Sequence, residues 1–307
     1  MEKEAKQIID LKRNLFKIDV RAQKDEEKVF MRTACLKRDF DFRKVSFHGT
    51  ISKIILLKEK PVFYAYLRGL VVFLLWVVNG NAHYHHEENM LDASENYILV
   101  APHRTFWDPV YMAFAARPKQ FVFMAKKELF TNRLFAWWIK MCGAFPIDRD
   151  KPSPDAIRYP VNMLKKSNRS LLMFPSGSRH SQEVKGGVAV IAKMAKVKVM
   201  PAAYQGPMSV KGLLAGERVD MTFGNPIDVS DIKRMNDEGI AEVANRIQAE
   251  FDQMDDELAP FQPGKARNPL TYLYRLPLGL VLVVVLLLTM LFSYIASFVW
   301  DPDKHRH

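Results

Sequence analysis

Tyr97-Ile-Leu-Val-Ala-Pro-His-Arg-Thr-Phe-Trp-Asp108 is the stretch from which the rest of the chain can be organised. Its first four residues form a short apolar run of the kind that builds a buried β-strand, and Pro102 ends that run. Asp108 precedes Pro109, and this pair favours a helix start because Asp caps free N–H groups and Pro fits the first turn. The stretch therefore predicts His103 at the end of a core strand, one turn from a carboxylate at a helix N-terminus.

A histidine and an aspartate in this arrangement are the base and the orienting acid of a Ser-His-Asp triad, whose nucleophilic hydroxyl would come from elsewhere. The chain has eight histidines, and such a pair also arises by chance in roughly one sequence in two. His103 and Asp108 alone therefore identify no reaction, and the neighbouring segments must decide.

Short apolar runs alternate with segments of helical periodicity along the middle of the chain. The predicted strands cover residues 97–100, 121–124, 170–174, 197–204 and 221–223, and residues 143–149 are predicted as a turn with a short strand that ends in Arg149. The predicted helices cover residues 108–117, 127–141, 155–166, 187–195 and 238–258. Strands that alternate with helices indicate an α/β fold in which the helices pack on a sheet.

Charged or titratable side chains follow the predicted strands at four separate junctions, and these are His103, Lys126, Arg149 and Arg179. In open α/β sheets ligands bind in the crevice at the carboxyl ends of the strands. The four junctions together therefore predict a single anion-binding catalytic cleft. In the loop before Arg179, Gly177 exposes backbone N–H groups that suit a developing oxyanion.

The net charge of +11 is unevenly spread, because residues 61–200 carry +9 while residues 201–270 carry −5. A basic half of this kind suits nucleic acid, anionic lipid or a phosphorylated substrate, or is simply a solvated surface. The basic residues are not interleaved with stacking aromatics in a recognisable module, which disfavours a nucleic-acid binder.

Disulfide and metal sites are not expected from the composition. The two cysteines, Cys35 and Cys142, provide neither a disulfide framework nor a metal quartet, and they favour a reducing, cytosol-facing location. The segment 83–88, His-Tyr-His-His-Glu-Glu, has no matching ligands downstream, so we interpret it as a solvated surface and predict no metal. The charged start of the chain is not typical of a secretory signal.

Two apolar segments indicate contact with a membrane. Residues 62–78 have a fully apolar core of nine residues, whereas a spanning helix needs about 20. They suit a helix lying in the interface, with a buried core helix as the alternative. Residues 276–299 carry no charge and would form a helix about 36 Å long, enough to span a hydrocarbon core of about 30 Å. Arg275 and Trp300 flank them as interfacial anchors, and a small excess of basic residues on the N-terminal side predicts a cytosolic catalytic domain on the cytoplasmic membrane.

These observations divide the chain into four segments. We interpret residues 1–61 as a basic N-terminal extension that is poorly ordered or adventitious. Residues 62–82 form the interface helix, residues 83–270 the catalytic domain, and residues 271–307 a C-terminal transmembrane helix with a short tail.

Four blocks in this order resemble the 1-acylglycerol-3-phosphate acyltransferases of the glycerolipid acyltransferase superfamily, bacterial type, and the resemblance covers about residues 62–230. Residues 103–108 match the His-x-x-x-x-Asp block, and residues 143–149, Gly-Ala-Phe-Pro-Ile-Asp-Arg, match the second block. Residues 174–179, Phe-Pro-Ser-Gly-Ser-Arg, match a block that usually reads Phe-Pro-Glu-Gly-Thr-Arg, and residues 199–201 match the last, a strand that ends hydrophobic-Pro.

The resemblance implies a mixed central sheet flanked by helices, with an N-terminal interfacial helix. The C-terminal transmembrane helix is predicted from the apolar run of residues 276–299. The resemblance also implies acyl transfer from acyl-CoA or acyl carrier protein to lysophosphatidic acid, without a cofactor or metal. His103 would be the general base and Asp108 its orienting acid. The substrate-binding residues would be Lys126, Arg149, Gly177, Ser178 and Arg179.

One departure from the family pattern concerns the acceptor. Ser176 stands where the family has a Glu that is associated with acceptor binding. Transfer to a different lysolipid or alcohol is therefore the first alternative, and a non-catalytic lipid-binding protein is the second. The sequence leaves the acyl donor, the acyl length and the oligomeric state open.

Overall fold

The computed structural model describes residues 66, 69–74, 76–77, 80, 82–105, 107–148, 153–177, 183–261, 270 and 272–299. The chain divides into two compact units, residues 1–53 and 54–307, and every described residue belongs to the second. The predicted extension 1–61 lies outside the described residues, as do three predicted substrate-binding residues, Arg149, Ser178 and Arg179.

Within the described part of the chain, seven strands form one sheet in the order β1-β7-β6-β2-β5-β3-β4. The strands are β1 (Ala82–His85), β2 (Ile98–Val100), β3 (Phe121–Lys126), β4 (Ala144–Ile147), β5 (Ser170–Met173), β6 (Val199–Gln205) and β7 (Val219–Phe223). The five strands from β6 to β4 are parallel to one another, whereas β7 is antiparallel to β6. The predicted mixed sheet is thus confirmed.

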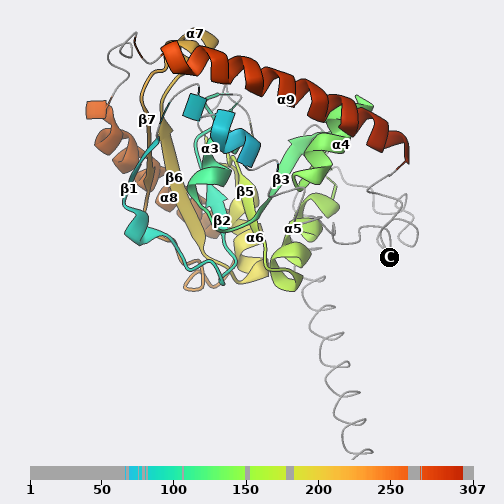
Figure 1. The fold of residues 1–307 in the computed structure, drawn as a ribbon. Coiled ribbons are helices and arrows are strands. Elements are labelled where there is room, and N and C mark those ends of the chain that lie inside the picture. The colour runs from blue at the N-terminus through green and yellow to red at the C-terminus, as the bar shows by residue number, and fades with distance from the viewer. Residues whose placement is uncertain are drawn as a thin grey trace, which may run out of the picture. The chain divides into compact units, whose positions relative to one another are not determined.

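The helices cover both faces of this sheet (Figure 1). They are α3 (Asp108–Ala115), α4 (Arg133–Met141), α5 (Asp155–Lys166), α6 (Gly187–Ala195), α7 (Val210–Ala215), α8 (Asp237–Leu258) and α9 (Tyr272–Val299). Short 3-10 turns lie at Glu87–Asn89, Lys127–Phe130 and Ala259–Phe261. The predicted strands and helices are confirmed within a few residues, except that the helix expected from residue 127 begins at Arg133.

Alternating side chains of the strands build one core on each face. Ile98 and Val100 of β2 join the cluster formed with α5, α6 and α8, whereas Leu99 joins the cluster formed with α3. This alternation follows from the two-residue period of a strand. Because β2-to-β3 and β3-to-β4 connections advance in the same direction across the sheet, their right-handed crossovers place α3 and α4 on one face.

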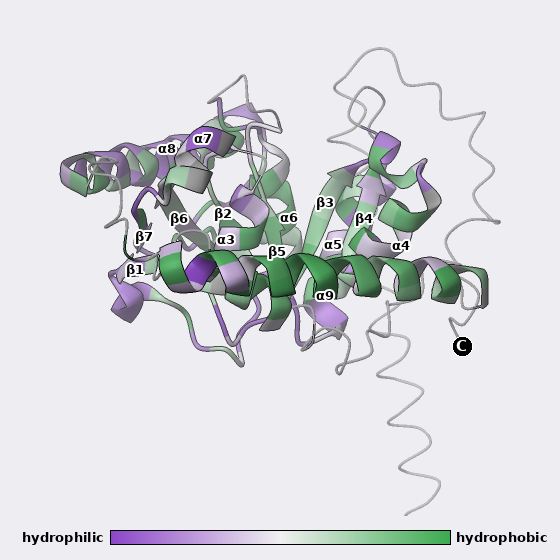
Figure 2. Cartoon of the chain, turned by 45° about the horizontal axis from the view of Figure 1, so that its top comes forward, coloured by the Kyte–Doolittle hydropathy of each residue, from purple (hydrophilic) through white to green (hydrophobic). Residues whose placement is uncertain are grey.

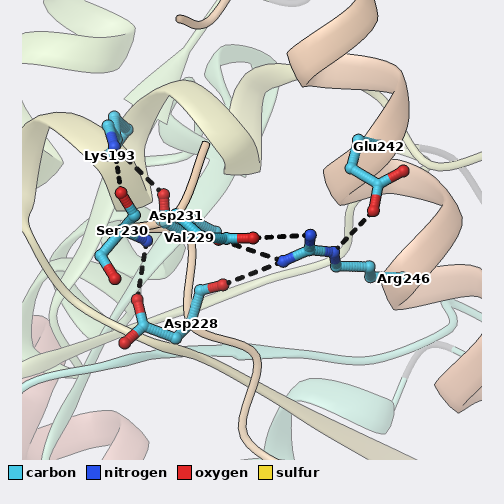
Figure 3. Close-up of polar contacts among 7 residues, drawn as sticks. All are labelled: Lys193, Asp228, Val229, Ser230, Asp231, Glu242 and Arg246. Atoms are coloured by element: carbon cyan, nitrogen blue, oxygen red, sulfur yellow. Dashed lines mark hydrogen bonds and ion pairs between the residues drawn. The ribbon is translucent and has the colours of Figure 1, made fainter. Parts of the chain in front are cut away.

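The loop between β7 and α8 is held on the other face by long basic side chains (Figure 3). Lys193 of α6 donates to the carbonyl oxygens of Val229 and Ser230 at 3.2 and 3.0 Å. Arg246 of α8 pairs with Asp231 at 2.7 Å. These contacts fasten the loop to α6 and α8, and α8 itself packs on β6.

The segment 83–88 is not simply the solvated surface that we predicted. Residues 82–85 form β1, which pairs with β7, and His85 Nε2 lies 2.9 Å from Oδ1 of the fully buried Asp220. His85 also stacks on Phe261. The prediction was wrong for His85 because its partner lies 135 residues away in the sequence, and a strand pairing of that range leaves no local pattern.

Asp220 provides a test of the β1–β7 edge. Burial by itself would raise the pKa of Asp220, but hydrogen bonds from Arg218 and His85 outweigh burial and leave the pKa below its ordinary value. A carboxyl group with a lowered pKa stabilises the fold above its unfolded-state pKa of about 3.9 and loses this contribution as the pH falls through its folded value.

We expect Asp220→Asn to lower the free energy of unfolding at pH 7 by about 1.5–3 kcal/mol, the range for hydrogen bonds to a charged group. Thermal unfolding of both proteins would measure it. The difference from the wild type should shrink at a pH below about 3, where the wild-type carboxylate is protonated as well. Asp256→Asn, at an exposed position of α8, is the control, and an equal loss in both variants would contradict the expectation.

Candidate active site

His103 and Asp108 lie together where β2 ends and α3 begins. His103 Nδ1 is 3.2 Å from Asp108 Oδ2, and their side chains are 16% and 1% exposed. An ionised carboxylate only accepts hydrogen bonds, so Nδ1 carries the proton and Nε2 is left with its lone pair. Nε2 has no hydrogen-bond partner among the described residues. The pair therefore has the geometry of an oriented general base.

The carboxylate of Asp108 is held by the loop that precedes it. It accepts hydrogen bonds from the backbone N–H groups of Arg104 and Thr105 at 2.6 and 2.7 Å, and from the Thr105 hydroxyl. The predicted helix-capping role was wrong, because Trp107 is the N-cap residue and Asp108 is the first residue of α3. Its side chain points back to the loop instead, which fixes the carboxylate that orients His103.

The loop after β5 packs against His103. The rings of Phe174 and His103 stack with their centroids 4.4 Å apart, which restrains the imidazole plane. Ser176 is buried at 5% exposure, and Gly177 has a φ of +66°, a conformation that favours glycine. The Gly177 N–H donates to the Phe174 carbonyl at 2.9 Å, so this N–H is already bonded within the turn. Donors for an oxyanion in this loop would have to be the N–H groups of the residues beside Gly177.

The order of the strands brings the described members of the predicted site to one edge. Strands β2, β5, β3 and β4 are parallel neighbours, so their carboxyl ends meet along this edge. His103 follows β2, Gly177 follows β5 and Lys126 ends β3. Arg149 and Arg179 come shortly after β4 and β5 in the sequence, beyond the described residues.

Comparison with known proteins identifies the family. The chain is 66% identical over 245 residues to a 1-acyl-sn-glycerol-3-phosphate acyltransferase of Streptococcus pneumoniae, and it covers 93% of that relative's length. The chain belongs to the 1-acyl-sn-glycerol-3-phosphate acyltransferase family. Residues 82–205 also match the acyltransferase family model. It is therefore an enzyme, which decides against the non-catalytic alternative.

More distant relatives agree with this assignment. An acyltransferase of the same name from Bacillus subtilis is 32% identical over 184 residues and is covered over 92% of its length. The crystal structure of the 1-acyl-sn-glycerophosphate (LPA) acyltransferase PlsC from Thermotoga maritima shares the fold, with a TM-score of 0.50 at 20% identity. That likeness covers 66% of this chain and 85% of the other.

The basic residues after β3 differ in their surroundings. Lys126 is about half exposed and lies 3.6 Å from Glu128, so it reaches solvent at the carboxyl end of β3. Lys127 pairs with Asp148 at 2.5 Å. This pair links the end of β3 to the end of β4.

Sequence reasoning missed three residues that hold the loops of the candidate site. Arg104 donates to the Tyr204 carbonyl at 3.1 Å and to the Asp255 carboxylate of α8. Trp107 Nε1 donates to the Pro207 carbonyl at 3.0 Å. The bonds to Tyr204 and Pro207 fasten the His103 loop to the end of β6, and the bond to Asp255 fastens it to α8.

Lys185, the third missed residue, lies beside the loop that follows β5. A Cβ built on Gly177 would be 3.8 Å from Lys185 Nζ, and the Lys185 N–H donates to the Pro175 carbonyl. The only sequence signal for it was a cation shortly after the third block.

Proposed function

We propose that this enzyme transfers a fatty acyl group from acyl-CoA or acyl carrier protein to the free hydroxyl of lysophosphatidic acid, giving phosphatidic acid. The 66% identical relative from S. pneumoniae carries the corresponding name, and this observation supports the acceptor. The oriented base at His103 supports the chemistry, because an alcohol attacks a thioester readily only when its proton is removed.

In the proposed step, His103 Nε2 accepts the proton of the acceptor hydroxyl as its oxygen bonds to the thioester carbonyl carbon. The carbon–sulfur bond then breaks, the carbonyl re-forms, and the leaving thiolate takes the proton from the imidazolium. The substrate hydroxyl replaces the serine of a triad, so no covalent enzyme intermediate is formed. Asp108 holds the tautomer that exposes Nε2 and stabilises the imidazolium.

The remaining substrate contacts follow from position and charge. Lys126, Arg149 and Arg179 would bind the phosphate of lysophosphatidic acid, where an arginine offers a bidentate pair of donors. Backbone N–H groups beside Gly177 and the hydroxyl of Ser178 would stabilise the oxyanion of the tetrahedral intermediate. No metal or organic cofactor enters these steps.

The substrates also explain attachment to the cytoplasmic membrane. Lysophosphatidic acid and phosphatidic acid are lipids, whereas acyl-CoA and acyl carrier protein are cytosolic. In the described part of the chain, residues 272–296 form one helix that is long and apolar enough to enter a membrane. We therefore place the catalytic domain on the cytosolic side, with its basic half facing anionic headgroups.

The acceptor is tested by assaying purified enzyme in detergent with one thioester donor and a panel of acceptors. The panel contains lysophosphatidic acid, lysophosphatidylglycerol, lysophosphatidylcholine and glycerol 3-phosphate. We expect kcat/KM to be highest for lysophosphatidic acid, by more than tenfold. Transfer to another acceptor with none to lysophosphatidic acid would support the alternative that Ser176 keeps open. Repeating the assay with acyl-CoA and acyl carrier protein identifies the donor.

A further inference from the structure

Helix α9 has an unusual distribution of polar and apolar side chains. A stripe of less exposed residues recurs every three or four positions along it, which is the spacing of a helix packed on one side. This stripe contains Arg275, Leu278, Gly279, Leu282, Val285, Leu286, Thr289, Ser293 and Ala296. Leu282, Thr289 and Ser293 are nearly fully buried, at 3%, 7% and 0% exposure.

The opposite side of α9 is exposed and apolar (Figure 2). Its large side chains are between 46% and 75% exposed, and they are Leu273, Leu276, Leu280, Val281, Val283, Val284, Leu287, Leu288, Met290, Leu291, Phe292, Ile295 and Phe298. An exposed apolar surface of this length on a soluble protein marks a site of interaction. The helix is therefore amphipathic, but its polar residues Arg275, Thr289 and Ser293 face the protein and its apolar side faces outward.

The helical residues before β1 pack antiparallel along this stripe. Tyr66 contributes a hydroxyl contact to Thr289 at 2.5 Å. Farther along the same segment, Trp76 lies 6.1 Å from the ring of Tyr274 and 5.8 Å from the Arg275 guanidinium. As the residue number rises before β1, the partner number on α9 falls. The predicted interface helix and the predicted transmembrane helix are thus neighbours.

Helix α9 also packs on α4, which belongs to the catalytic body between β3 and β4. Both views show α9 running along the domain across α3 and α4 (Figures 1 and 2). The packed stripe from Arg275 to Ser293 corresponds to about 27 Å of helix. This length is nearly the full thickness of a hydrocarbon core, which is about 30 Å.

If α9 crossed the bilayer along the membrane normal, the catalytic domain would have to lie beyond one end of the helix, outside the hydrocarbon. If α9 did so while packed on α4, that part of the body would lie inside the hydrocarbon. Charged side chains lie next to α4, such as Lys127, which is 51% exposed and belongs to the 3-10 turn that contacts this helix. Burying such charges in lipid is costly.

We propose that α9 lies lengthwise in the cytosolic leaflet, with its exposed side in the acyl chains and its polar stripe against α4 and the segment before β1. This inference rests on the proposed membrane attachment, and it replaces a spanning orientation. His103 stacks on Phe174, which packs against the same core cluster as α3, so a helix in the leaflet on that side brings the catalytic edge to the membrane surface. Lysolipid and product would then exchange with one leaflet only.

The location of the C-terminal tail distinguishes the two orientations. In a Cys35→Ser, Cys142→Ser background, we would introduce Lys304→Cys in the tail or Asp256→Cys at an exposed position of α8. Intact protoplasts and lysed membranes would be treated with a membrane-impermeant maleimide. We expect both cysteines to react only after lysis. Reaction of Lys304→Cys in intact protoplasts, with Asp256→Cys protected, would overturn the proposal.

Depth measurements test the same point within α9. Spin labels on Leu276→Cys, Val283→Cys and Met290→Cys lie on one side of the helix, since the positions are seven residues apart. In liposomes, accessibility to oxygen and to a polar nickel reagent should indicate the same depth for all three. A spanning helix would place the label at residue 276 about 10 Å shallower than that at 283, which would contradict the proposal. Exclusion of all three labels from lipid by a second copy would contradict it too.

Acyl transfer is measured on the same preparations with the acceptor panel. An enzyme that prefers another acceptor but keeps a protected tail would refute the proposed acceptor and support the orientation of α9. An enzyme that makes phosphatidic acid but exposes its tail outside the cell would support the proposed acceptor and refute the orientation of α9.

Discussion

Replacing His103 by alanine is expected to lower kcat for acyl transfer by about 1,000-fold, within the range that a general base contributes. The variant lacks the nitrogen that would accept the proton of the acceptor hydroxyl. It keeps the edge of the sheet at which we propose that both substrates bind, so KM should change by less than threefold. Steady-state assays with lysophosphatidic acid and acyl-CoA measure both quantities.

The loss in His103→Ala must be separated from damage to the fold. Removing the imidazole also removes its stacking on Phe174, so thermal unfolding should be compared with that of the wild type. His83→Ala is the matched control, because His83 is an exposed histidine of β1 and should retain full activity. A folded His103→Ala enzyme that turns over within tenfold of the wild type would refute the role of general base.

Local patterns were sufficient to predict most elements of this fold. Apolar runs identified β2, β3 and β5, and the Asp108-Pro109 pair identified the start of α3 to within a residue. These features depend on neighbours in the sequence, so they can be seen without knowing the tertiary structure.

The spatial order of the strands could not be derived in the same way. The chain passes through β2, β3, β4 and β5, but the sheet places β5 between β2 and β3. This order sets the loop of Phe174 and Gly177 directly beside His103. A pattern of apolar runs shows that strands exist but carries no information about which of them pair.

Long-range side-chain contacts were missed for a related reason. Arg104 appears in the sequence as one more basic residue, yet its partners are Tyr204 and Asp255, which are 100 and 151 residues away. Asp108 was expected to cap α3, because Asp before Pro usually does so. In the structure two N–H groups of the preceding loop compete for that carboxylate and bind it.

Replacing Asp108 by asparagine is expected to lower kcat by at least 100-fold, and loss of the correct tautomer costs up to about 10,000-fold in a triad. The wild-type carboxylate accepts from His103, from two backbone N–H groups and from a hydroxyl. An amide has one oxygen and one NH₂ group, so its NH₂ group faces either His103 and the two N–H groups or the Thr105 hydroxyl, which can accept. In both orientations the negative charge that stabilises the imidazolium is lost. If the NH₂ group faces His103, Nδ1 becomes the acceptor and the proton moves to Nε2, which can then no longer accept one.

The same substitution should also destabilise the loop, by about 1–3 kcal/mol for a buried donor left without its partner. Thr105→Ala separates the two effects, because it removes the hydroxyl from the carboxylate but leaves the contact between His103 and Asp108. We expect Thr105→Ala to lose comparable stability and less than tenfold in kcat, while Asp108→Asn loses both. If the two variants lost kcat equally, Asp108 would support the loop alone, and the orientation of the base would have to come from the stacking of Phe174 on His103.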